Sequence, residues 1–180
     1  MSEPLSHADL VAIAARWLKN TVRCGVVLTE APAMDGESPD AIGWRSSHSV
    51  LVECKVSRAD FLADRKKAGR ADGRRLAWRC YYLTPPGLLR VDEVPVSWGL
   101  LEAHGRTVRV IREVPAATLD YDDRCADDLR CEVRLLWAEL RRYHAQGITY
   151  KTMTGKVAQA HILESSLDHS SVGQGVYEEP

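Results

Sequence analysis

The chain has 180 residues, of which 45% are hydrophobic and 27% are charged, and its formal net charge is −1. This composition excludes a disordered or membrane-embedded protein, and the length suits one hydrophobic core with appendages. No apolar run approaches the roughly 18 residues of a membrane span, and residues 1–18 lack the zones of a signal peptide. We therefore expect a cytoplasmic protein that has no membrane partner.

A helix followed by three strands is predicted at the start of the chain. Residues 7–19 place apolar side chains at helical spacing behind Ser6, which forms a capping box with Asp9. The predicted strands span residues 22–29, 40–44 and 49–55. The last two are close enough in sequence to form a hairpin.

A second helix and a fourth strand follow. Ser57 is the predicted cap of the helix, Asp60 completes its capping box, and Phe61 and Leu62 form its inner side. This helix is expected to end near Lys67, before a basic, glycine-bearing loop. The predicted strands of this part span residues 78–83, 98–103 and 107–111, the last two as a hairpin.

The chain after Pro115 is predicted to be mainly helical. From Asp122 to Ala145, apolar residues recur at alternating steps of four and three, which indicates a long amphipathic helix. A further helix is predicted over residues 155–167. The expected fold is therefore α/β, with a central mixed sheet flanked by helices, an added β-hairpin and a long C-terminal helix. The expected parts are a core (1–115), a helical extension packed on it (116–167) and a flexible tail (168–180).

Five cysteines without a CxxC pair indicate reduced thiols rather than disulfides or a zinc site. Cys54 and Cys80 lie in apolar strand-like runs and are expected to be buried as small hydrophobic residues.

Acidic residues and one lysine gather where the predicted strands end. Glu30 follows the first strand, Asp40 opens the second, and Glu53 and Lys55 end the third. Side chains alternate along a strand, so Glu53 and Lys55 point to one face of the sheet and Cys54 to the other. Asp40 and Glu53 can supply the oxygen ligands that Mg²⁺ or Mn²⁺ needs, and Glu30 is either a further ligand or an ordinary loop carboxylate. Lys55 would orient a water molecule or stabilise negative charge.

The segment from Lys55 to Arg79 contains nine Lys or Arg residues against three Asp residues. This local excess of positive charge is a candidate nucleic-acid surface, because neutralisation of phosphates dominates such binding. The candidate contact residues are Arg58, Lys66, Lys67, Arg70, Arg74 and Arg75. A solvated helix end would give the same pattern, and charge alone leaves the two interpretations open.

The pair Pro39 and Asp40, followed after a hairpin by Glu53, Cys54 and Lys55, resembles the PD-(D/E)xK nuclease superfamily over about residues 7–84. Its core order of helix, three strands, helix and strand is the order predicted above. The resemblance implies that Asp40, Glu53 and the backbone carbonyl of Cys54 bind the metal, and that Lys55 assists the nucleophile. It further implies hydrolysis of phosphodiester bonds, in DNA repair, restriction or phage DNA processing.

Two further comparisons refine this resemblance. Glu30 is similar to an extra acid that many members carry, although others place that acid in the first helix. The segment VECKVSRADFLADRKK, followed by YYL, PPG and WGLLE, looks like the MmcB-type DNA-repair proteins and related small phage nuclease-like proteins. The helix after Lys55 lacks the Gln and Tyr motif of the RecB-like subgroup.

Three functions stay open from the sequence. The first is a metal-dependent deoxyribonuclease, for which Lys55→Ala is expected to remove cleavage without affecting folding. The second is a nuclease-fold module that binds nucleic acid or protein without turnover. The third is an assembly protein in which the long helix forms a homodimer seam. If these residues had no function, Glu53 and Lys55 would form a surface ion pair at a strand end, and Asp40 would be an ordinary turn residue.

Overall fold

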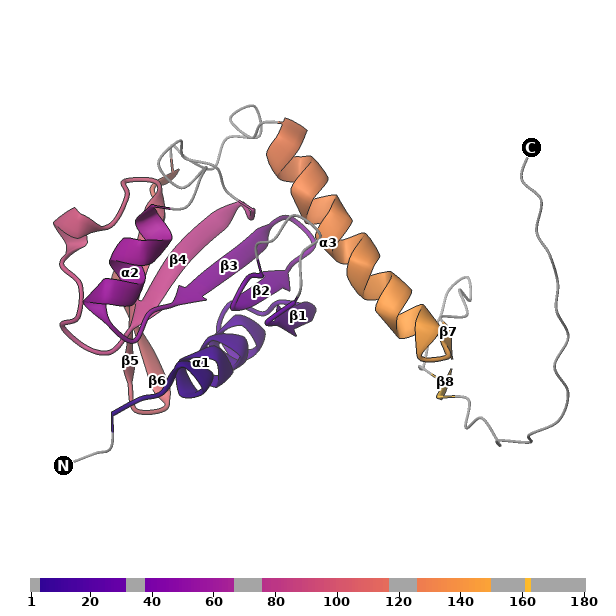
Figure 1. The fold of residues 1–180 in the computed structure, drawn as a ribbon, viewed down its shortest axis with the longest axis horizontal. Helices are drawn as coiled ribbons and strands as arrows, with labels where there is room; N and C mark the ends of the chain where they lie inside the picture. The colour runs from indigo at the N-terminus through magenta and orange to yellow at the C-terminus, as the bar shows by residue number, and fades with distance from the viewer. Residues whose placement is uncertain (1–3, 32–37, 67–75, 117–125, 150–160, 163–180) are drawn as a thin grey trace, which may run out of the picture. The chain divides into compact units, whose positions relative to one another are not determined.

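The computed structural model describes residues 4–31, 38–66, 76–116, 126–149 and 161–162 (Figure 1). The chain divides into two compact units, residues 1–139 and 140–180. The helices are α1 (His7–Asn20), α2 (Arg58–Arg65), the short 3₁₀ helix η1 (Val91–Glu93) and α3 (Ala126–Ala145). The strands are β1 (Val26–Thr29), β2 (Ala41–Trp44), β3 (Ser49–Cys54), β4 (Arg79–Thr84), β5 (Trp98–His104), β6 (Thr107–Arg112), β7 (Ile148–Thr149) and β8 (His161–Ile162).

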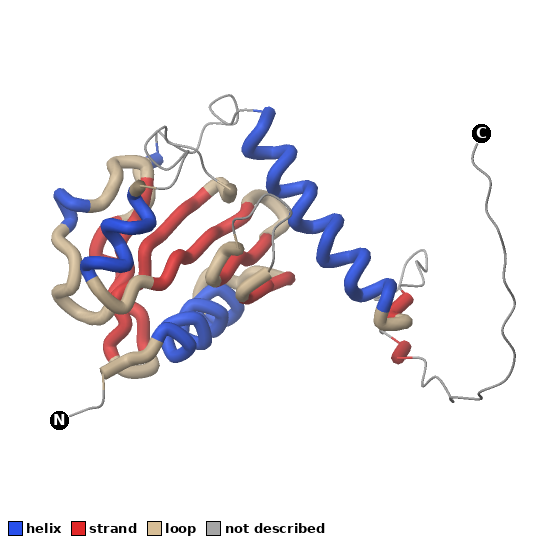
Figure 2. Tube along the Cα trace, in the orientation of Figure 1, coloured by secondary structure: helices blue, strands red, loops and turns tan. Residues whose placement is uncertain are grey.

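Six strands form one mixed sheet in the order β1-β2-β3-β4-β5-β6 (Figure 2). The β1–β2, β2–β3 and β5–β6 pairs are antiparallel, whereas β3–β4 and β4–β5 are parallel. The parallel β3–β4 pair requires a crossover, which α2 provides. The predicted α/β class, with a mixed sheet flanked by helices, an added hairpin and a long helix near the C-terminus, is confirmed.

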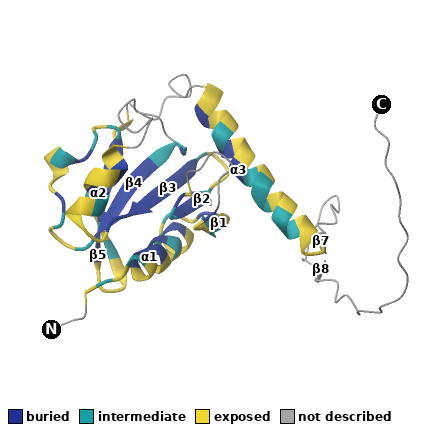
Figure 3. Cartoon of the chain, in the orientation of Figure 1, coloured by how far each residue is buried: buried dark blue, intermediate teal, exposed yellow. Residues whose placement is uncertain are grey.

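The two faces of the sheet carry separate hydrophobic clusters. Residues of α1 pack with Val50, Val52 and Cys54 on one face, and Phe61 of α2 packs with Leu51 on the other. This split follows from the alternation of side chains along β3. All six residues of β3 are buried, and Figure 3 shows β3 and β4 as the most enclosed part of the sheet. Cys54 and Cys80 are buried as predicted.

Several predicted boundaries differ from the structure. Strand β1 begins at Val26 rather than at residue 22, because Arg23 adopts a left-handed conformation with φ 65° in the turn after α1. Helix α2 ends at Arg65. Ser57 caps it by accepting a hydrogen bond from the Asp60 N–H, but among the described contacts Asp60 does not return a bond to the Ser57 backbone, so the predicted capping box is only half formed. The inner side of α2 consists of Phe61 and Asp64, whereas Leu62 is 47% exposed, so the prediction for Leu62 is wrong.

The long helix is present, but a different face from its apolar stripe is buried. The described part of α3 buries Asp128, Glu132 and Leu135, while Leu129 and Val133 are largely exposed. Glu132 accepts a hydrogen bond from Trp44 Nε1 at 2.7 Å, which attaches α3 to the sheet through a polar contact. Helical periodicity therefore predicted the helix but not the face that it presents to the sheet.

The predicted helix over residues 155–167 lies almost wholly outside the described residues. Within it, the structure describes His161–Ile162 as strand β8, paired with β7, so the helical prediction is wrong at these two positions. The division into a core, an extension and a tail stays a prediction. Among the described residues, no helix is long and apolar enough to cross a membrane.

Candidate active site

Strands β2 and β3 bring Asp40 next to Glu53. Ala41 pairs with Val52 in the antiparallel ladder, so Asp40, one residue before β2, continues the register opposite Glu53. The described pairing of β2 with β3 begins at Ala41, so the Asp40 backbone is not part of it. Instead, Asp40 Oδ2 accepts a hydrogen bond from the Cys54 N–H at 2.7 Å, which fixes the carboxylate against the end of β3.

The backbone at the end of β3 presents the Cys54 carbonyl to the same side. A strand residue points its N–H and C=O toward the same neighbouring strand. The Cys54 N–H points toward Asp40, whereas the Lys55 N–H donates to the Leu83 carbonyl of β4 at 3.0 Å. The Cys54 carbonyl therefore lies on the Asp40 side of β3, beyond the start of β2.

Lys55 is buried between two carboxylates. Its Nζ lies 3.5 Å from Glu53 Oε2 and 3.4 Å from Asp64 Oδ1. The side chains of Lys55 and Glu53 are only 6% and 5% exposed, and that of Asp64 is 1% exposed. A surface ion pair is therefore the wrong description of Glu53 and Lys55. Burial by itself lowers the pKa of Lys55, but the carboxylates of Glu53, Asp64 and Asp40 outweigh burial and raise it, so Lys55 is a charged donor.

Asp64 and Tyr82 complete this buried cluster. The Tyr82 hydroxyl donates to Asp64 Oδ2 at 2.9 Å, so the carboxylate contacts both Tyr82 and Lys55. Sequence reasoning missed both residues. The available signal was helical spacing, since Asp64 lies three residues after Phe61 and therefore on the same inner face of α2.

The other end of the Asp40 carboxylate faces α1. Asp40 Oδ1 lies 3.4 Å from His7 Nε2, and the His7 side chain is 43% exposed. No histidine was predicted to belong to the site. The structure nevertheless places His7, the first residue of α1, beside a candidate metal ligand.

Glu30 lies apart from the cluster. It has a left-handed backbone with φ 49°, and its N–H donates to the Asp40 carbonyl at 3.1 Å. Its side chain is exposed, and no described hydrogen bond or ion pair joins that side chain to Asp40 or Glu53. The strands therefore bring Asp40, Glu53, Cys54 and Lys55 together, but not the Glu30 carboxylate.

Two of the predicted phosphate-contacting residues are described. Arg58 Nη1 donates to Glu93 Oε2 at 3.0 Å, and its second nitrogen, Nη2, contacts Oε1 of the same carboxylate. Hydrogen bonding from Arg58 lowers the pKa of Glu93 to about 2. Arg58 thus ties α2 to η1, although its side chain stays 53% exposed. Lys66 is exposed at the C-cap of α2, while Lys67, Arg70, Arg74 and Arg75 lie outside the described residues.

The charge and the chemistry of this site suit a hard divalent cation. The carboxylates of Glu53 and Asp64 lie against the ammonium of Lys55, and Asp40 adds a third carboxylate beside them. In proteins, Mg²⁺ is usually held by one or two carboxylates, with water and phosphate oxygens completing its coordination. Among the described residues, no group of three or more His, Cys, Asp or Glu side chains is placed to hold a metal. Asp40, Glu53 and the Cys54 carbonyl nevertheless fit the two-carboxylate pattern.

Comparison with known proteins identifies the fold and leaves the function open. No protein-family profile matches the chain, and no curated protein matches it. Among solved structures, it is similar to SPO1766, a protein of unknown function from Silicibacter pomeroyi, with a TM-score of 0.54 and 23% sequence identity, covering 79% of this chain and 92% of that chain. Similarity at this level shows a common α/β fold.

Proposed function

We propose that this protein is a divalent-metal-dependent nuclease of the PD-(D/E)xK type that hydrolyses phosphodiester bonds in DNA. The observation that carries the proposal is the meeting of Asp40, Glu53 and Lys55 at the carboxyl end of β3. The element order α1-β1-β2-β3-α2-β4 supports it, because it matches the core order that the resemblance implies. In open α/β sheets, ligands bind at the carboxyl ends of the strands.

Asp40, Glu53 and the Cys54 carbonyl would hold the cation, which we expect to be Mg²⁺ or Mn²⁺. When bound, such an ion neutralises charge on a phosphate and lowers the pKa of a coordinated water. The hydrogen bond from the Cys54 N–H to Asp40 orients one ligand before any substrate arrives. This pre-orientation reduces the reorganisation that binding would otherwise require.

Lys55 would stabilise the negative charge that develops on the phosphate and position the attacking water. Asp64 is the positioning residue for Lys55. It holds Nζ at 3.4 Å and is itself held by the Tyr82 hydroxyl, so Lys55 keeps a buried partner when Glu53 is engaged elsewhere. Such a second layer of contacts is what keeps a site within productive geometry.

A cleavage assay tests the proposal directly. Plasmid, single-stranded and branched DNA, together with an RNA of matched sequence, would be incubated with the protein in Mg²⁺, Mn²⁺ or EDTA. We expect DNA cleavage in either metal and none in EDTA. Asp40→Asn and Glu53→Gln should each reduce the rate at least about a hundredfold, because a metal ligand is lost.

Two carboxylate variants serve as references in the same assay. Asp92→Asn changes an exposed residue that pairs with Arg90, and it should leave cleavage unchanged. Glu30→Gln should retain cleavage, because its side chain is not joined to the cluster; a loss would restore Glu30 to the ligand set. Metal-independent cleavage, or equal rates for Glu53→Gln and Asp92→Asn, would refute the nuclease proposal.

The burial of Glu53 and Lys55 favours one second candidate, a nucleic-acid-binding module without turnover. Side chains that are 5% and 6% exposed leave little access for a phosphate without rearrangement. In this case the parent would bind DNA in a gel-shift assay with no cleavage in either metal. Glu53→Gln would then bind DNA as tightly as the parent does.

A further inference from the structure

The N-terminal end of strand β3, next to the β2–β3 hairpin, carries a basic cavity that is separate from the carboxylate site. The β2–β3 hairpin closes with a hydrogen bond from the Arg45 N–H to the His48 carbonyl at 2.9 Å. Because Trp44 pairs with Ser49, Arg45 and His48 stand opposite each other in the continued register, with Ser46 and Ser47 at the tip. Residues opposite each other in an antiparallel pair point to the same face.

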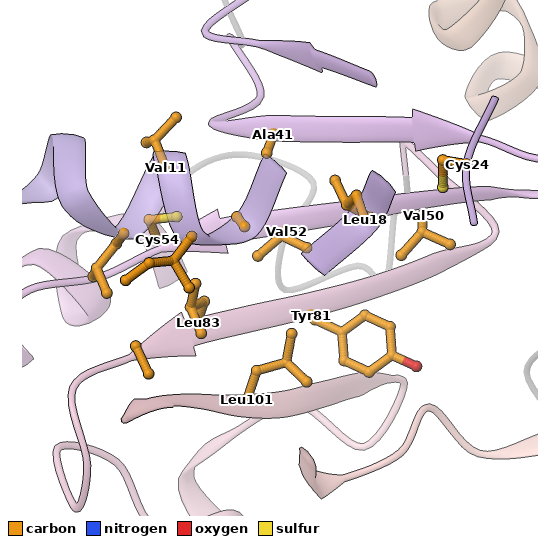
Figure 4. Close-up of a cluster of buried hydrophobic side chains, with 14 of the residues drawn as sticks. Val11, Leu18, Cys24, Ala41, Val50, Val52, Cys54, Tyr81, Leu83 and Leu101 are labelled. Atoms are coloured by element: carbon orange, nitrogen blue, oxygen red, sulfur yellow. The ribbon is translucent and has the colours of Figure 1, made fainter. Parts of the chain in front are cut away.

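Strand β4 adds a second arginine on this face. Arg79 pairs with Val50, which is two residues beyond His48, and Tyr81 follows with the same orientation. Val50 and Tyr81 both belong to the hydrophobic cluster beneath α1, which identifies the face (Figure 4). The register alone therefore gathers two guanidinium groups and one imidazole at the hairpin end of the sheet.

These side chains line a cavity of about 200 Å³. The C-terminal end of α1 forms its other wall through Trp17, Thr21 and Val22. Glu113, which follows β6, is the single acidic residue among the described residues that line the cavity, and it accepts a hydrogen bond from the Tyr81 hydroxyl at 2.7 Å. Burial, and then this hydrogen bond, raise the pKa of Tyr81 to about 12, so its hydroxyl remains a donor.

The cavity has an excess of positive charge. Among the described residues, neither Arg45 nor Arg79 forms an ion pair with a carboxylate, although Arg79 approaches the Tyr81 hydroxyl. Two guanidinium groups thus face one carboxylate. Burial, then the charges of Arg79 and Arg45, lower the pKa of His48, which keeps its ring neutral. A bound group with negative charge would counteract the effect of the two arginines on the pKa of His48.

We propose that this cavity binds a tetrahedral oxyanion, namely the phosphate group of a small molecule or the terminal phosphate of a nucleic-acid strand. Guanidinium groups bind phosphate with two parallel hydrogen bonds, and a histidine that gains a proton adds a third charged donor. The volume is below the roughly 300 Å³ at which pockets begin to hold drug-sized ligands, so it suits a phosphate group with Trp17 as an apolar wall.

A purely structural role for the arginines is the competing explanation. The carbonyl end of α1 carries partial negative charge, which favours nearby cations. In that case Arg45 and Arg79 balance α1 and Glu113, and the cavity takes no ligand. The two explanations differ in what an added oxyanion does to His48.

The experiment follows the His48 ring by NMR while pH is varied in the full chain. Titrations would be made in chloride, in sulfate and in inorganic phosphate at matched ionic strength. Sulfate does not take up a proton over the pH range in which His48 titrates, so any tightening of sulfate binding as pH falls must come from a protonation of the protein. We expect sulfate and phosphate to raise the pKa of His48 relative to chloride, and sulfate to bind more tightly at lower pH.

Variants assign the effect to the cavity. Arg79→Gln and Arg45→Gln should each weaken sulfate binding about tenfold or more, because a charge-assisted contact is lost. Arg106→Gln, at the tip of the exposed β5–β6 hairpin, should leave binding unchanged. The same His48 pKa in all three salts, or equal weakening in Arg106→Gln, would overturn the proposal. Thermal unfolding of each variant checks that it is folded. If Arg79→Gln does not fold, Arg45→Gln provides the same test.

Three further ligands separate the two sources of phosphate, all in EDTA so that metal-dependent cleavage does not interfere. These are a nucleoside monophosphate, a 5′-phosphorylated oligonucleotide and the same oligonucleotide without that phosphate. A small-molecule site binds the monophosphate at least as well as the phosphorylated strand. A strand-end site binds the phosphorylated oligonucleotide more tightly than both the monophosphate and the unphosphorylated oligonucleotide, and Arg79→Gln removes this preference. If none of the three raises the pKa of His48, the cavity takes no phosphate group.

Discussion

The two ends of β3 and β4 form opposite environments within one sheet. At the carboxyl end, Lys55 is enclosed by Glu53 and Asp64, and each of the three side chains is at most 6% exposed. At the hairpin end, Arg45, Arg79 and His48 line an open cavity, and Glu113 is the one acid among its described lining residues. The first site is organised by its own internal ion pairs, whereas the described lining of the second has more cationic donors than carboxylates.

The largest expected effect is at the enclosed end. Lys55→Ala leaves Glu53 and Asp64 buried without their shared cation, which should lower the free energy of unfolding by about 3–5 kcal/mol. Sequence reasoning expected this variant to fold normally, whereas the burial of Lys55 predicts a less stable fold, and the variant decides between the two. Urea unfolding at pH 7 measures the effect, with the exposed Lys66→Ala as a reference expected within about 0.5 kcal/mol.

The pH dependence of the same variant supplies a second measurement. Without Lys55 the folded state should take up protons on these carboxylates more readily than the unfolded state does. Stability relative to the parent should then improve as pH falls. A destabilisation that stays constant from pH 7 to pH 5 would contradict the buried-charge explanation.

A somewhat smaller effect is expected from Gly99→Ala, which acts on the hairpin end. A Cβ at Gly99 would lie 2.3 Å from the Tyr81 ring and 2.8 Å from the Arg112 carbonyl, so the ring that lines the basic cavity must shift. Overpacking of this kind costs about 1–3 kcal/mol. We expect weaker sulfate binding but an unchanged Lys55 pKa, measured by NMR; a change at Lys55 would mean that the two ends are coupled.

Removal of the Tyr82 hydroxyl probes the support of Asp64 alone. Tyr82→Phe should destabilise the fold by about 1–2 kcal/mol, because a buried hydrogen bond to a carboxylate is lost. In the cleavage assay this variant should lower kcat more than it raises KM, since Asp64 acts through Lys55. Tyr143→Phe, on α3, serves as the matched hydroxyl deletion. Equal stability and kcat for parent and Tyr82→Phe would mean that Asp64 does not need this support.

The smallest expected effect concerns His48. Its folded-state pKa lies below the unfolded value of 6.5, so its contribution to stability is present above pH 6.5 and is lost as pH falls toward the folded value. His48→Gln should flatten this part of the stability profile by less than about 1 kcal/mol. Sulfate should flatten it in the parent as well, and a profile insensitive to sulfate would argue against the basic cavity as an oxyanion site.

The sequence by itself determined the elements that place both sites. Capping by Ser6, alternation along β3 and the short hairpin were sufficient to predict α1, the strands and the grouping of Asp40, Glu53 and Lys55. These signals are local, since each depends on residues a few positions apart. The enclosed end was accessible to sequence reasoning for this reason.

Only the tertiary structure decided which distant residues join these groups. Asp64 meets Lys55 and Tyr82 because α2 crosses over the sheet between β3 and β4, and Arg79 meets Arg45 and His48 because β4 pairs in parallel with β3. Exposure is also decided at this level: Glu30 is left outside the cluster by a left-handed turn. Such contacts depend on strand register and helix placement, which set burial across the sheet and cannot be read from the spacing of neighbouring residues.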